Sequence, residues 1–179
     1  DGADRIQAHR LGCRRRRPIR RFGVYRRRLC HRGGAFGDDD AGSNSGAAHI
    51  FFRTGNTWSE QFELTASDAA ADDEFGYSVS INGDYVIVGA YLDDDDGDAS
   101  GSAYIFARSD TTWAQQEKLT ASDAAVNDFF GYSVSMSDDY SIVGAYGNDN
   151  AGGNSGSAYI FARSGATWTQ QATLTASDA

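Results

Sequence analysis

A segment of 49 residues occurs twice in this chain, in register and without a gap. Residues 75–123 return 55 positions later as residues 130–178, and 34 of the 49 positions are identical. A partial third copy, residues 34–68, lies one period upstream. A fixed period near 50 residues is typical of propellers, solenoids and arrays, in which each unit buries its apolar surface against its neighbours.

Within each copy the side chains alternate as they do in β-strands. In residues 75–81 large apolar side chains alternate with small ones, and residues 85–91 form an apolar run suited to a strand covered on both faces. The turn sequence Asn82-Gly83-Asp84 separates these two segments. Two further strands are expected at residues 103–107 and 113–119. The repeat therefore predicts an all-β fold with four short antiparallel strands per 55 residues.

Two short motifs recur at fixed places in these copies. They are Phe75-Gly76 with Val88-Gly89-Ala90, Phe130-Gly131 with Val143-Gly144-Ala145, and Gly34-Ala35 in the partial copy. In these residues the chain resembles the FG-GAP repeat family, most closely its bacterial and archaeal type, and the resemblance covers residues 34–179. The best-known members of this family form the β-propeller of integrin α subunits. The resemblance implies that each copy is one four-stranded propeller blade.

The number of copies suggests an incomplete ring. Closed propellers have about 4–8 blades, whereas 179 residues with a 55-residue period hold about three. We therefore expect a fragment of a β-propeller, completed by the remaining blades of a longer parent chain. The expected blades are residues 35–74 (partial), 75–129 (complete) and 130–179 (nearly complete).

Residues 1–34 do not follow the repeat. Residues 9–33 hold 11 of the 16 basic residues and no acid, which leaves 5 basic and 25 acidic side chains elsewhere. If residues 8–34 are read one base later, the genetic code permits the residue of segment 64–90 at 24 of 27 positions. We interpret residues 1–34 as a frameshifted or disordered remnant of a blade. A genuine basic tail and a nucleic-acid-binding arm are the alternatives, and no nucleic-acid partner is expected.

The acidic side chains are concentrated in loops. An up-and-down blade places alternate loops at one end, so the loop after the second strand and the loop into the next blade share a face. Carboxylate and asparagine oxygens are ligands that Ca²⁺ prefers. The candidate calcium ligands are Asp38, Asp39, Asp40, Asp93, Asp94, Asp95, Asp96, Asp98, Asn148, Asp149 and Asn150. The alternative is a solvated acidic surface that binds no ion.

The metal site of the resembling family does not transfer to this chain. In integrin-type propellers Ca²⁺ binds in a loop between the Phe-Gly and Gly-Ala motifs. Here that interval holds only the hairpins at residues 81–84 and 136–139, which are too short for such a loop. The acidic loops of this chain follow the Gly-Ala motif instead.

Recurring aromatic residues are interpreted as packing groups. Trp58, Trp113 and Trp168 occupy one position in the repeat, which favours packing between blades over a carbohydrate platform. Tyr77 and Tyr132 also recur at one position and are interpreted in the same way.

No arrangement of residues indicates catalysis. The sequence holds no Ser/His/Asp or Cys/His set, no His group with metal-ligand spacing and no phosphate loop, so no enzyme activity is expected. His49, which replaces a tyrosine of the other copies, is interpreted as structural. No apolar run approaches the roughly 18 residues of a membrane helix.

The favoured function is a non-enzymatic, extracellular or cell-surface scaffold for interaction or adhesion, with a protein or glycan ligand on a propeller face. One alternative is the propeller accessory region of a secreted hydrolase or carbohydrate-active enzyme. The other is a calcium-dependent structural repeat array.

Overall fold

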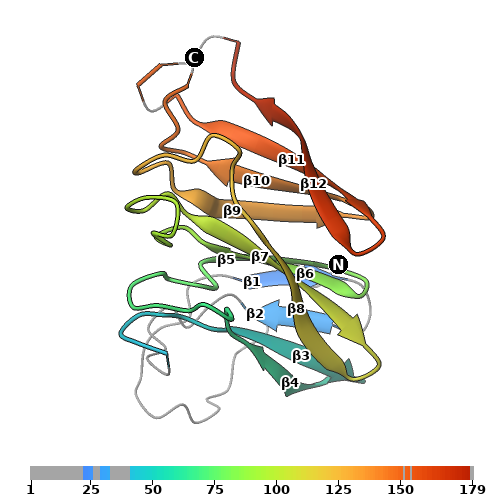
Figure 1. Ribbon diagram of the computed structural model, residues 1–179. Helices are drawn as coiled ribbons and strands as arrows, with labels where there is room; N and C mark the ends of the chain where they lie inside the picture. The colour runs from blue at the N-terminus through green and yellow to red at the C-terminus, as the bar shows by residue number, and fades with distance from the viewer. Residues whose placement is uncertain (1–21, 26–28, 33–40, 151, 154, 178–179) are drawn as a thin grey trace, which may run out of the picture.

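A computed structural model describes residues 22–25, 29–32, 41–150, 152–153 and 155–177. The described residues form three antiparallel sheets of four strands each, stacked one on another (Figure 1), and they contain no helix. In each sheet the strands lie side by side in chain order, so consecutive strands are joined as hairpins. The all-β class and the four-stranded blades are confirmed, and the architecture is that of a β-propeller segment.

The strand bounds repeat from sheet to sheet. The first sheet contains β1 (Phe22–Tyr25), β2 (Leu29–Arg32), β3 (Ala48–Thr54) and β4 (Thr57–Leu64). The second contains β5 (Ser78–Asn82), β6 (Tyr85–Ala90), β7 (Ser102–Ser109) and β8 (Thr112–Leu119). The third contains β9 (Phe130–Ser137), β10 (Tyr140–Ala145), β11 (Ser157–Ser164) and β12 (Thr167–Leu174).

Local sequence explains the hairpins. Gly55 and Gly165 adopt φ angles of +63° and +64° in the turns between the third and fourth strands of their sheets, a conformation that side chains other than glycine rarely adopt. The register shifts at the same place in all three outer hairpins, after Ile50, Ile105 and Ile160. This recurring bulge shows that the three sheets are copies of one structural unit.

The hydrophobic core lies between the sheets. One cluster joins the first and second sheets and includes Ile50, Leu64 and Val88. A second joins the second and third sheets and includes Ile87 and Val143. Neighbouring residues of β6 thus point into different clusters, which is why its sequence is apolar throughout rather than alternating. The innermost strands β5 and β9 pack against each other, as do β6 and β9.

The first two strands lie within the segment interpreted as frameshifted. β2 pairs with β3 as β6 pairs with β7, because Leu29 lies opposite Phe52 and Tyr85 opposite Ala107. Leu29 therefore corresponds to Tyr85, an offset of 56 residues, whereas Phe52 and Ala107 keep the period of 55. The frameshift and the blade boundaries stay predictions.

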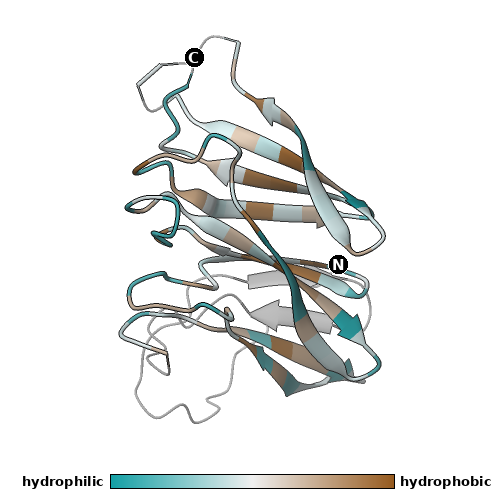
Figure 2. Ribbon diagram, viewed as in Figure 1, coloured by the Kyte–Doolittle hydropathy of each residue, from teal (hydrophilic) through white to brown (hydrophobic). Residues whose placement is uncertain are grey.

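The two ends of the stack differ. The longer loops, which include residues 65–77, 91–101, 120–129 and 146–150, gather at one edge, and the hairpin turns lie at the opposite edge (Figure 1). We call these edges the loop end and the hairpin end. Figure 2 shows hydrophobic residues along strands such as β9, β10 and β11, whereas the outermost strand β12 is mostly hydrophilic and the loops mix hydrophilic and hydrophobic residues. Within the described part of the chain, nothing qualifies as a membrane-spanning helix.

Candidate functional site

A lysine holds the acidic loop of the second sheet in place. Lys118 Nζ, from the outermost strand β8, lies 3.0 Å from Asp68 Oδ2, 3.0 and 3.2 Å from the two carboxylate oxygens of Asp93, and 2.6 Å from Asp95 Oδ2. Asp93 is only 3% exposed and also accepts hydrogen bonds from Tyr104 Oη (2.6 Å) and Ser102 Oγ (3.0 Å). The ammonium is therefore the counter-ion of a buried carboxylate. We call these residues the lysine cluster.

The protonation of this cluster follows from its geometry. Burial alone would lower the pKa of Lys118, but its hydrogen bonds to Asp95, Asp93 and Asp68 outweigh burial and raise that pKa. Burial, reinforced by the hydrogen bond to Asp93, raises the pKa of Tyr104. Both side chains thus keep their protons at neutral pH and donate them to carboxylates.

The third sheet has uncharged residues in place of this ion pair. One period after Asp93 and Lys118 the chain has Asn148 and Thr173. Asn148 is buried, its Oδ1 accepts from Ser157 Oγ (2.7 Å), and its Nδ2 donates to Asp128 Oδ2 (3.1 Å). Both the carboxylate and the ammonium of the second sheet are thus replaced by uncharged groups in the third. In both sheets this position therefore ties the loop to the strands.

Asp73, in the loop entering the second sheet, is a buried acid beside other acids. It accepts a hydrogen bond from the backbone N–H of Ala70 (2.8 Å). Burial, together with the charges of Asp93 and Asp94, raises its pKa to about 6. Its counterpart Asp128 accepts the equivalent bond from the backbone N–H of Ala125 (3.0 Å) and a further one from the Asn148 amide (3.1 Å).

Asp73→Asn is expected to stabilise the protein at pH 7. Since folding raises the pKa of Asp73 from 3.8 to about 6, its contribution to stability is complete below pH 3.8 and is lost as the pH rises through about 6. The substitution should raise the free energy of unfolding by about 1–3 kcal/mol at pH 7 and change it little at pH 4. Urea unfolding at the two pH values measures this. Asp128→Asn is the control and should not stabilise, because the residue beside it is the neutral donor Asn148 rather than a carboxylate, so no repulsion is relieved; an equal effect of both substitutions would contradict the assignment.

The structure separates the predicted calcium ligands into three groups. Asp38, Asp39 and Asp40 lie outside the described residues. Asp93 and Asn148 are buried within the hydrogen-bond networks above. The exposed members are Asp94, Asp95, Asp96, Asp98, Asp149 and Asn150. Of the predicted set, Asp93 and Asp95 come together with Asp68 and Lys118, neither of which is among the predicted calcium ligands. Calcium binding stays a prediction.

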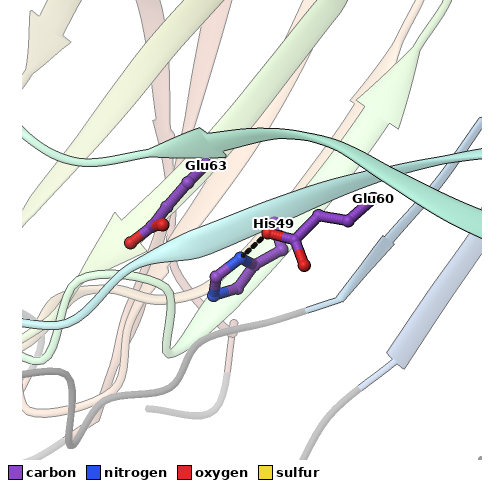
Figure 3. A group of neighbouring side chains, drawn as sticks. All are labelled: His49, Glu60 and Glu63. Atoms are coloured by element: carbon purple, nitrogen blue, oxygen red, sulfur yellow. Dashed lines mark hydrogen bonds and ion pairs between the residues drawn. The ribbon is translucent and has the colours of Figure 1, made fainter. Parts of the chain in front are cut away.

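The first sheet has a different group in the corresponding place. His49 on β3 and Glu60 and Glu63 on β4 project from neighbouring strands (Figure 3), and their ligand atoms lie within 4.8 Å of one another. His49 Nδ1 is 2.9 Å from Glu60 Oε1. These three residues align with Tyr104, Gln115 and Lys118 of the second sheet. His49, which the sequence analysis interprets as structural, therefore forms an imidazole–carboxylate pair with Glu60.

Aromatic side chains form a continuous row at the loop end. Tyr77 contacts Tyr91 (ring centroids 4.3 Å apart), Tyr91 contacts Tyr132 (5.5 Å), and Tyr132 contacts Tyr146 (4.5 Å). Phe129 stacks on Tyr146 at 4.8 Å with an interplanar angle of 5°. The row joins the second and third sheets, and its members are partly exposed, Tyr146 most of all at 50%. We call it the aromatic row.

The recurring tryptophans behave differently from the row. Trp113 and Trp168 are buried and belong to the two core clusters, as predicted for packing groups.

At the hairpin end, charges are largely paired within a sheet. Arg108 binds Asp84, and Arg163 binds Asp139. At the loop end, by contrast, Lys118 is shared by three carboxylates, those of Asp68, Asp93 and Asp95.

Comparison with known proteins identifies the repeat. No curated protein matches the chain. The sequence model of the FG-GAP repeat matches residues 58–106 and 113–161, together more than half of the chain. Each match begins in the outermost strand of one sheet and ends in the third strand of the next, so the family unit spans the contact between two blades. The chain belongs to the FG-GAP repeat family.

Proposed function

We propose that this chain is a non-enzymatic segment of an extracellular or cell-surface β-propeller, and that it binds a protein partner at its loop end. The observation that carries the proposal is the aromatic row, which crosses two blades at the end where the carboxylates gather. Membership of the FG-GAP repeat family supports the propeller and its location outside the cell.

The chemistry of the loop end favours a lysine- or arginine-rich partner. Faces of tyrosine rings attract cations, and desolvation strengthens this attraction. The exposed carboxylates of Asp94, Asp96 and Asp98 add a negative potential that steers basic segments toward the surface. A neutral glycan would use the rings but not the carboxylates, so the two ligand classes can be separated.

The first test compares two tyrosines of similar exposure at opposite ends. Tyr146 is 50% exposed in the aromatic row, and Tyr140 is 54% exposed at the hairpin end. With a hexa-arginine peptide as probe, Tyr146→Ala should weaken binding about 5-fold, since a cation–π contact is worth roughly 1 kcal/mol at an exposed site. Tyr140→Ala should leave binding unchanged. Equal losses in the two variants, or binding of maltohexaose in place of the peptide, would contradict the proposal.

The second candidate function, a calcium-dependent array, is favoured by the exposed carboxylates of one loop. Ca²⁺ at 2 mM should raise the melting temperature if Asp94, Asp96 and Asp98 coordinate it, and the triple change to asparagine should remove that rise. Monovalent salt at equal ionic strength is the control, because screening alone also stabilises an acidic surface. We expect no difference between Ca²⁺ and the salt control, because the Lys118 ammonium already lies between the carboxylates that this part of the structure brings together, Asp68, Asp93 and Asp95.

A further inference from the structure

A bulge places three side chains of the first sheet on one face. In a regular strand, residues three apart project to opposite faces of the sheet. Glu63 on β4 lies opposite His49 on β3. The register then shifts, so that Glu60 lies opposite Phe51, two residues after His49, and Gln61 has no opposite residue in β3. Glu60 and Glu63 therefore both lie on the face of His49 (Figure 3).

The side chains of His49, Glu60 and Glu63, which we call the histidine cluster, are close enough to share one ion. One ligand atom from each lies within 4.8 Å of the other two. His49 Nδ1 and Glu60 Oε1 are 2.9 Å apart, as in a hydrogen bond. Donor atoms of a tetrahedral Zn²⁺ site are about 3.3 Å apart, because each lies about 2.0 Å from the metal. Rotation of the exposed Glu60 and Glu63 side chains spans the remaining difference.

The donor set of the histidine cluster is that of a transition-metal site. Neutral imidazole is a ligand for Zn²⁺, Cu²⁺, Ni²⁺ and Fe²⁺. Ca²⁺ sites, in contrast, are built from oxygen ligands. One imidazole with two carboxylates supplies three ligands and leaves a coordination position for water. The histidine cluster therefore differs in kind from the aspartates of the acidic loops.

The histidine cluster occurs in one copy of the repeat. The equivalent residues are Tyr104, Gln115 and Lys118 in the second sheet and Tyr159, Gln170 and Thr173 in the third. In the second sheet Tyr104 and Lys118 both bind Asp93, so these two positions converge on one point. There the lysine supplies a positive charge, whereas in the first sheet Glu63 replaces that lysine. The first sheet thus has three metal-ligating side chains where the second has a tyrosine, an amide and an ammonium.

Burial holds the imidazole in place and leaves the carboxylates accessible. The His49 side chain is 15% exposed, and that of Glu60 is 44% exposed. A ligand that is already held in position loses little freedom when it binds an ion. An ion reaches the cluster from solvent and, once bound, links β3 to β4, which is the last strand of its sheet.

We propose that His49, Glu60 and Glu63 bind Zn²⁺ at the loop end of the first sheet, with water completing the coordination. Imidazole and carboxylate bind the metal in their deprotonated forms, so Zn²⁺ competes with the proton of the hydrogen bond between His49 and Glu60. Because the folded chain brings the three ligands together from two strands, Zn²⁺ binding stabilises the hairpin of β3 and β4.

The test titrates the full chain with ZnCl₂ and follows the backbone amides by NMR. We expect saturable shifts at His49, Gln61 and Glu63, and no shift at these amides with CaCl₂ or MgCl₂ at the same concentration. Thiolates are also zinc ligands, so the titration is repeated with Cys13→Ser and Cys30→Ser combined. The same shifts should persist there at one ion per chain. Their loss in this variant would assign the zinc to the thiols and overturn the proposal.

Three further variants separate the histidine cluster from general negative charge. His49→Tyr introduces the residue of the other two sheets, and Glu63→Gln keeps the shape of the side chain. Each should weaken Zn²⁺ binding at least about tenfold, since even an outer-shell partner of a metal ligand typically contributes about 10–100-fold. Asp110→Asn removes an exposed carboxylate from the turn between β7 and β8 and should change nothing. Absence of shifts in the unchanged chain, shifts that persist in His49→Tyr, or equal affinities of Glu63→Gln and Asp110→Asn would overturn the proposal.

Discussion

Lys118→Thr is expected to lower the free energy of unfolding by about 2–4 kcal/mol, because removing one partner of a buried ion pair leaves the other charge uncompensated. The charge left behind is that of Asp93, which is 3% exposed. Its remaining donors are the Ser102 and Tyr104 hydroxyls and the backbone N–H of Asp95, none of which carries a charge. Urea unfolding at pH 7 measures the loss.

The double change Asp93→Asn with Lys118→Thr tests the cause. It recreates the pair that the third sheet uses, Asn148 and Thr173. We expect the double variant to recover most of the stability lost in Lys118→Thr, which corresponds to a coupling energy of about 1.5–3 kcal/mol between the two positions. If the double variant loses the sum of what Asp93→Asn and Lys118→Thr each lose alone, the two residues are not coupled and the lysine cluster does not hold the loop.

Gly89→Ala is expected to destabilise the protein by about 3 kcal/mol or more, because over-packing against a fixed backbone forces the two sheets apart. The new Cβ would lie 2.0 Å from the carbonyl oxygen of Gly131. Gly144 occupies the same Val-Gly-Ala motif one period later and meets only the Ser133 side chain. Gly144→Ala should change stability by less than about 1 kcal/mol, since alanine is otherwise the better residue in a strand. Losses of similar size in the two variants, measured by urea unfolding, would argue against the close contact between Gly89 and Gly131.

The repeat made the fold predictable because strands and hairpins are local. Alternating side chains and glycine turns lie within a few residues of one another, and the predicted strands of the second blade correspond to β5–β8. The exception is Phe75, which the alternation placed in the first strand of its own sheet, whereas Gly76 does donate its N–H to Gly89 O of that sheet (3.0 Å). Phe75 bridges instead to Gly46 of the preceding sheet, and β5 begins at Ser78. Alternation cannot show which sheet a residue pairs with.

The candidate site was harder to predict because its members are distant in sequence. Asp68 and Lys118 are 50 residues apart and meet only when two sheets stack. The sequence analysis treated the acids from Asp93 to Asp98 alike, whereas the structure buries Asp93 and exposes the others. One signal was present: Asp93 and Lys118 both change to uncharged residues in the next copy. When a negative and a positive residue are both replaced by uncharged residues in another copy of the repeat, the two residues are expected to be in contact.

Consecutive sheets are joined where Phe75 and Phe130 form parallel bridges to Gly46 and Gly101, and amide hydrogen exchange of the two phenylalanines tests this contact most directly. Both N–H groups donate to a carbonyl of the preceding sheet, and both residues are fully buried. We predict protection factors close to that of Ile105, in the middle of β7 and also fully buried. Exchange as fast as that of Gly165, in the exposed turn between β11 and β12, while Ile105 stays protected, would show that the sheets fold without being joined in this way.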